Sequence, residues 1–189
     1  MSYWSRNNGI HWRDASNNRL RRLAEERAYE IEPQMDDAET EHDGTIQVYF
    51  GSSCDEIRLG LTSSATSIFK YGYCVLLAYA IHLKTDLPLF LFTSTTKETG
   101  WSGHAGVINP ETNKFIDIQG THEIANVRNS FPNIDEGHEV TREEFLNLVI
   151  SEEYRDEPFG FLDELEQLIV DHFADLVIEE TKIKQLVTA

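Results

Sequence analysis

The sequence is poor in cysteine, which bears on both its stability and its compartment. The 189-residue chain contains only Cys54 and Cys74. Small secreted domains that depend on disulfides usually carry more cysteines than this. We therefore expect no disulfide framework, and we expect the protein to be kept in a reducing cytoplasm.

Long apolar segments are also missing from the chain. No hydrophobic run approaches the roughly 20 residues that are needed to cross a bilayer. Residues 1–12 lack the apolar core of a signal peptide. From these two observations we expect no membrane partner.

Basic residues are scarce relative to acidic ones. Lys and Arg together number 16 against 33 Asp and Glu, which gives a formal net charge of -17. Binding to nucleic acid through phosphates needs clustered Lys and Arg, so we expect no direct nucleic-acid contact. A basic protein or peptide remains compatible as a partner, and so does mimicry of DNA, although solubility is the simplest meaning of the charge.

The remaining composition is that of a globular protein, for which we expect an α+β fold. Hydrophobic residues make up 40% of the chain, and its length suits one domain with appended elements. We expect an N-terminal helix and acidic linker over 1–44, a core over 45–140, and C-terminal helices packed on the core over 141–189. Trp4 and Trp12 are candidate anchors onto the core.

Hydrophobic periodicity and turn residues predict the elements. Strands are expected at Thr45–Phe50, Glu56–Leu61, Leu89–Thr93, His104–Asn109 and Lys114–Ile118, the last two forming a hairpin. Helices are expected at Asp14–Glu32, Cys74–Lys84, Thr141–Ile150 and Phe161–Leu186. The stretch 120–139 is predicted to be mostly irregular. The apolar stripe of the last helix predicts packing on the domain, with a homodimer interface as the alternative.

A cysteine stands at the entrance of the almost wholly apolar segment Tyr71–Leu83. Cys74 follows Gly72 and occupies the first helical turn, where backbone N–H groups are unpaired and the helix dipole is positive. Both features favour the thiolate, which is the nucleophilic form of cysteine. Taken alone, however, the helix is better explained by a small cysteine in the core.

His104 and Asp117, further along the chain, favour the interpretation of Cys74 as a nucleophile. His104 opens one strand of the predicted hairpin, and Asp117 lies on the other. If the register brings them level, they face the same side of the sheet as near cross-strand neighbours. A histidine oriented by a carboxylate and facing a cysteine at a helix N-terminus is the usual arrangement for thiol nucleophilic catalysis.

In their order and spacing these motifs resemble the papain-like superfamily, and most of all its transglutaminase-like branch. The motifs are G-Y-C at 72–74, D-L-P at 86–88, H-A-G-V at 104–107 and F-I-D at 115–117. The resemblance covers about residues 67–120. It implies a central Cys-bearing helix packed on an antiparallel sheet, and a thiol-dependent amide hydrolase or acyltransferase that acts on a peptide or protein without a cofactor. It also implies that Cys74 is the nucleophile, His104 the general base and acid, and Asp117 the orienting group.

The chain departs from the pattern of this superfamily in two places. Gly106 replaces the aromatic residue that often follows the histidine, and no glutamine stands a few residues before Cys74, where papain-like proteases carry an oxyanion-hole side chain. The Cys74 N–H can supply one donor. Candidates for the second donor, or for contacts with substrate, are Tyr71, Tyr73 and Gln119, and Trp101 is a further candidate for lining the cleft.

Other interpretations remain open at this stage. The same fold can serve as a catalytically inactive acidic binding protein, an inhibitor or a nucleic-acid mimic that engages a basic partner. Cys74, His104 and Asp117 are metal-ligand types, but their spacing matches no zinc pattern, so we expect no metal. Cys54 is interpreted as structural and His82 as a core or surface residue, whereas His122 belongs either to the same cleft or to a loop. His11, His42, His138 and His172 are predicted to lie on the surface.

Overall fold

The computed structural model describes residues 46–50, 53–57, 63–71, 73–94, 103–131, 133–150, 159–160, 162 and 164–183. The predicted helix over 14–32, the two N-terminal tryptophans, His11, His42 and the acidic linker lie outside these ranges. So do Gly72 and Trp101, and of Cys54 only the backbone is described. The division of the chain into three parts stays a prediction.

An antiparallel sheet of five strands forms the centre of the described structure, in the order β6-β5-β4-β3-β7. Its strands are β3 (Leu89–Thr93), β4 (Gly103–Asn109), β5 (Lys114–Asp117), β6 (Gly120–His122) and β7 (His138–Val140). The predicted hairpin is confirmed, since Val107 pairs with Ile116 and Asn109 with Lys114. At the turn, the Asn109 side chain accepts a hydrogen bond from the Glu111 N–H at 2.9 Å, as asparagine does in Asx turns.

The expectation of an irregular stretch over 120–139 is wrong in part. This stretch contains β6, α4 (Ile124–Ser130) and β7. Each is too short to show a clear hydrophobic period, and each strand owes its existence to a neighbour: β6 pairs with β5, and β7 with β3. Tertiary pairing therefore decided the conformation of this stretch.

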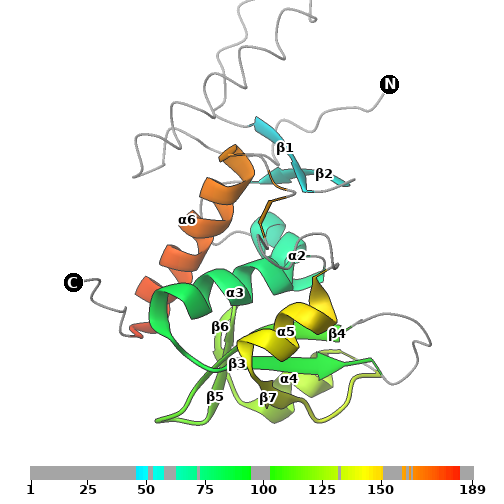
Figure 1. Ribbon diagram of the computed structural model, residues 1–189, viewed down its shortest axis with the longest axis vertical. Helices are drawn as coiled ribbons and strands as arrows, with labels where there is room; N and C mark the ends of the chain where they lie inside the picture. Colours follow the sequence, from blue (N-terminus) through cyan, green and yellow to red (C-terminus); the bar gives the residue numbers. More distant parts are fainter. Residues whose placement is uncertain are drawn as a thin grey trace, which may run out of the picture.

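The helix that begins at Cys74 is the central element of the core. Helix α3 (Cys74–Thr85) lies between the sheet and α6 (Glu164–Thr181), as Figure 1 shows, and most of its residues are buried. Its nearly uniform apolar character follows from this position, because both sides are covered. The helix ends at Asp86, which adopts a left-handed conformation and donates its N–H to the His82 carbonyl at 2.7 Å.

Two elements precede α3 in the described chain. The hairpin β1 (Ile46–Phe50) and β2 (Ser53–Ile57) matches the first predicted strand, but the second strand lies earlier than predicted. Helix α2 (Ser63–Tyr71) forms in a Ser- and Thr-rich stretch in which the sequence analysis did not predict a helix. It is anchored by Phe69, which is wholly buried and whose ring lies 5.0 Å from that of Phe173 on α6.

The C-terminal helices form where the sequence predicts them, with shorter bounds. Helix α5 (Arg142–Val149) begins with a capping box, in which Thr141 and Glu144 exchange hydrogen bonds. The stripe of α6 packs within the chain, and Ile169, Phe173 and Val177 are buried in the same core as α3. His172 was predicted to be on the surface, but it is buried, because it follows Ile169 and Val170 onto the inner side of α6.

The two faces of the sheet carry different side chains. Leu89, Leu91, Ala105, Val107 and Ile116 face the cluster that contains α3 and α6. Phe90, Phe92, Ile108 and Phe115 face the cluster that contains Val127 of α4. Within the described ranges, no helix is long and apolar enough to cross a membrane.

Candidate active site

Three elements bring Cys74, His104 and Asp117 to one end of the sheet. Cys74 begins α3, His104 is near the start of β4, and Asp117 ends β5. Extending the pairing of Val107 with Ile116 by one step sets Asp117 opposite Gly106, so that His104 is its diagonal neighbour on the same face. The His104 Nε2–H donates to Asp117 Oδ2 at 2.8 Å.

Gly106 is required by this arrangement. A Cβ at position 106 would lie 2.3 Å from Cζ of Phe115 and 2.5 Å from the Ile116 carbonyl oxygen. Both distances are too short for any side chain. The glycine that departs from the pattern of the papain-like superfamily is therefore explained by the Phe115 ring, which fills the space beside the histidine.

Asp117 accepts hydrogen bonds on both carboxylate oxygens. Besides His104 on Oδ2, the Gln119 backbone N–H donates to Oδ1 at 2.8 Å, and His122 Nε2 lies 3.2 Å from the same oxygen. Burial by itself raises the pKa of Asp117, but the hydrogen bonds from His104 and His122 outweigh burial and lower it well below its ordinary value. The carboxylate is thus held in its charged form.

His122 is a fourth residue of the site, and the sequence left its place open. It lies on β6, directly opposite Phe115, and 28% of its side chain is exposed. Its only signal in the sequence is its position shortly after Asp117 and Gly120. That signal does not distinguish a loop from a strand that folds back beside β5.

His104 is buried beside two groups that favour its protonated form. Burial by itself lowers the pKa of the imidazole, but the hydrogen bond to Asp117 and the proximity of Cys74 raise it from 6.5 to about 9. The protonated ring is therefore the dominant form at neutral pH. An imidazolium in this position can pair with a thiolate and can later release its proton.

The second ring nitrogen of His104 has no aligned partner. Nδ1 is buried and forms no hydrogen bond with the part of the chain that the structure describes. Because Nε2 is bonded to Asp117, Nδ1 is the nitrogen left for Cys74, whose thiol is near enough to raise the His104 pKa. Thiol–imidazole contacts that are poorly aligned without substrate are common in enzymes, and we take the contact as close but not hydrogen-bonded.

The reactive groups lie largely out of contact with solvent. The exposed fraction is 5% for Cys74, 0% for His104 and 4% for Asp117. The sequence-based hypothesis requires that the sulfur be reached from solvent, whereas Cys74 belongs to the buried cluster around α3.

An aromatic stack covers the imidazole. The ring of Phe131 stacks on His104 with centroids 4.5 Å apart, and Phe115 lies at 5.6 Å. Tyr71 contacts Phe131 at 5.8 Å, and the Lys70 ammonium lies 5.2 Å from the Phe131 ring centroid. These rings keep water from the buried ion pair. Phe131 was not predicted, because it lies in a stretch that was expected to be irregular.

The remaining predicted residues are placed as follows. Tyr71 is 69% exposed and reaches the site through Phe131. The backbone N–H of Tyr73 donates to the Ile68 carbonyl and that of Gln119 to Asp117, so neither N–H is available as a second oxyanion donor. The Tyr73 side chain does not cap α3, which leaves the positive end of the helix at Cys74. Among the described residues, no three His, Cys, Asp or Glu side chains are arranged so that they could hold a metal ion.

Comparison with known proteins does not place the chain in a family. No protein-family model, no curated protein and no solved structure matches the sequence or the fold.

Proposed function

We propose that the protein is a thiol-dependent amide hydrolase or acyltransferase of papain-like, and specifically transglutaminase-like, type that acts on a peptide or protein. The observation that carries the proposal is the buried His104–Asp117 pair at 2.8 Å, whose free imidazole nitrogen is left for Cys74 at the start of a buried helix. Ion pairs of this kind rarely repay the cost of their burial, so stability alone does not explain the pair. Hydrolysis ranks above cross-linking because water suffices as the acceptor.

The chemistry follows from the protonation states. Cys74 Sγ attacks the amide carbonyl carbon, and the charge that develops on oxygen is stabilised by the Cys74 N–H at the positive end of α3. His104 then gives its proton to the leaving nitrogen, and a thioester remains. Water attacks the thioester while His104 takes a proton from it, which releases the carboxylic acid and restores the thiolate and the imidazolium.

Asp117 and the groups around it position the imidazole. Asp117 stabilises the protonated ring and keeps Nδ1 turned away from itself, toward the thiol. The Gln119 N–H and His122 hold the carboxylate from the opposite side. The side-chain amide of Gln119 is not used by this network and is our candidate for the second oxyanion donor.

The test is selective alkylation of the intact protein by iodoacetamide near pH 6, followed by peptide mapping. We expect Cys74 to react at least about tenfold faster than Cys54, and we expect His104→Ala to remove that advantage. If Cys74 proves inert in the folded protein, the alternative of an inactive acidic binding protein is supported instead. That alternative predicts salt-sensitive binding to basic proteins that Cys74→Ala leaves intact.

A further inference from the structure

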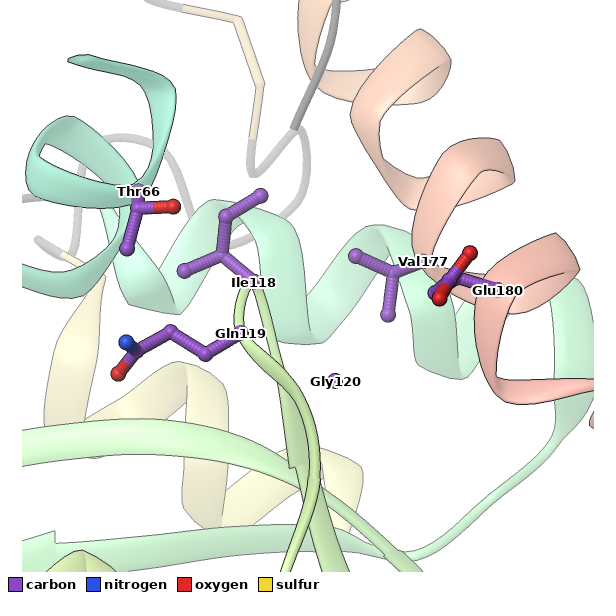
Figure 2. Close-up of a pocket in the computed structure, with 6 residues that line it drawn as sticks. All are labelled: Thr66, Ile118, Gln119, Gly120, Val177 and Glu180. Atoms are coloured by element: carbon purple, nitrogen blue, oxygen red, sulfur yellow. The ribbon is translucent and has the colours of Figure 1, made fainter. Parts of the chain in front are cut away.

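A cavity of about 290 Å³ lies between α2, the turn from β5 to β6, and the end of α6 (Figure 2). It is lined by Thr66, Ile118, Gln119, Gly120, Val177 and Glu180. Ile118 and Val177 are buried and supply apolar walls, whereas Gln119 and Glu180 are the exposed polar members of the lining. The volume is at the low end for a ligand pocket, which suits a single long side chain rather than a whole small molecule.

The lining of the cavity is negatively charged, because Glu180 is its charged residue. The Glu180 side chain forms no ion pair with any described residue. It lies in the last turn of α6, which contains no basic residue, and the C-terminal end of a helix is already negative. A carboxylate is unfavourable at that position unless a cation accompanies it. A lining that combines apolar side chains with the Glu180 carboxylate suits an aliphatic chain that ends in a cation.

Two residues of the lining belong to segments that neighbour the candidate active site in the chain. Thr66 belongs to α2, which ends at Tyr71 just before Cys74. Gln119 lines the cavity while its backbone N–H holds Asp117 Oδ1 at 2.8 Å. A group bound here therefore contacts the turn that follows the orienting carboxylate, and the helix that precedes the one beginning at Cys74.

We propose that this cavity is a subsite for a basic side chain, lysine or arginine, of the peptide or protein substrate. The inference rests on the proposed function and specifies its substrate class. The aliphatic part of the side chain lies against Ile118 and Val177, and its ammonium or guanidinium group meets Glu180. Because this ion pair is open to solvent, it contributes only about a twofold to fivefold preference over a neutral chain of the same length.

Binding is tested first on the full chain and without catalysis. Methyl NMR signals of Ile118 and Val177 are followed during titration with pentylamine, butylguanidine, neutral 1-pentanol and anionic pentanoate. We expect the two cations to bind about twofold to fivefold more tightly than 1-pentanol, and pentanoate to bind most weakly. Equal binding of pentylamine and 1-pentanol would overturn the proposal.

A matched pair of variants separates the subsite from general surface charge. Glu180→Gln should remove the preference for the cations, whereas Glu179→Gln, which makes the same charge change outside the lining, should preserve it. If both variants weaken amine binding equally, the effect belongs to the acidic surface and the subsite is refuted. Cys74→Ala should bind the amines as the wild type does.

The rate of peptide cleavage then tests whether the cavity binds a side chain of the substrate. Peptides that carry lysine, arginine, norleucine or glutamate at one position at a time are incubated with wild type and with Glu180→Gln. At one position the basic peptides should be cleaved about twofold to fivefold faster, and only by the wild type. Equal turnover of basic and norleucine peptides would overturn the subsite while the hydrolase stands. Amine binding by a protein whose Cys74 is inert would instead overturn the hydrolase.

Discussion

The two faces of the central sheet are buried to a similar degree but with different chemistry. The face toward α3 carries aliphatic side chains such as Leu91, Val107 and Ile116. The face toward α4 carries phenylalanines, and among them lie His104 and Asp117. One face holds only groups that gain from leaving water, while the other also buries two charges.

This difference separates the aliphatic packing that stabilises the fold from the buried His104–Asp117 pair, while Cys74 itself belongs to the cluster on the aliphatic side. Burial of aliphatic groups contributes roughly 25 cal/mol per Å² and needs no partner. A buried ion pair must recover a desolvation cost of several kcal/mol per ion, and hydrophobic residues of similar volume often serve stability as well or better. The aliphatic face therefore explains why the chain folds, and the aromatic face is the one that needs a chemical explanation.

The largest effect is expected from Asp117→Asn, which removes one charge from the aromatic face and keeps the shape. Without the carboxylate the pKa of His104 falls, and the imidazolium no longer supports a thiolate. Hydrolysis that depends on Cys74 should fall by about 10²- to 10⁴-fold, and alkylation of Cys74 at pH 6 by about tenfold. A variant that retains wild-type thiol reactivity would show that the pair is structural only.

On the aliphatic face, Ile116→Ala should lower stability and leave the reactivity of Cys74 nearly unchanged. The residue is 1% exposed, so truncation leaves a cavity and should lower the free energy of unfolding by about 2–5 kcal/mol. Urea titration measures this loss. The rate of Cys74 alkylation in the folded protein should stay within about twofold of wild type. A large loss of reactivity would mean that the two faces are not separable.

The pH dependence of stability should come from the aromatic face. The folded-state pKa of His104 is raised from 6.5 to about 9, so its stabilising contribution is complete below pH 6.5 and is lost as the pH rises toward about 9. The folded-state pKa of Asp117 is lowered, so its contribution is present above its ordinary value of 3.8 and is lost as the pH falls below that. Melting temperatures across pH 3–10 should show both limbs, and Asp117→Asn should flatten them.

The smallest effect is expected at His122, which is partly exposed and contacts the Asp117 carboxylate. His122→Ala removes one donor to Asp117 Oδ1 but leaves Gln119, so thiol alkylation at pH 6 should slow by about threefold to tenfold. His122→Gln can still donate a hydrogen bond and should restore most of the rate. If the alanine and glutamine variants behave alike, the histidine does not position the carboxylate.

Much of the local structure was predictable from neighbouring residues. The Thr141–Glu144 capping box, the apolar helix after Cys74 and the hairpin around Asn109 all depend on residues within a few positions of one another. Helix α4 and strands β6 and β7 were missed because they are short, and pairing or packing with distant segments decided them. Helix α2 was missed although one of its sides is apolar, because its Ser and Thr residues resemble those of a loop. Of the candidate site, Cys74, His104 and Asp117 were predicted by residue type and order, whereas Phe131 was not predicted and the place of His122 was left open.

The sequence by itself determined the helices after Cys74, Thr141 and Phe161, the strands of the hairpin around Asn109, and which three residues have the right chemistry. Hydrophobic period, capping and turn residues act over short distances along the chain, so they are present in the sequence. Only the tertiary structure decided that His104 meets Asp117 under Phe131, that Cys74 is nearly buried, and that Glu180 stands beside a cavity. Those facts depend on contacts between segments far apart in the chain, which the folding of the whole core brings together.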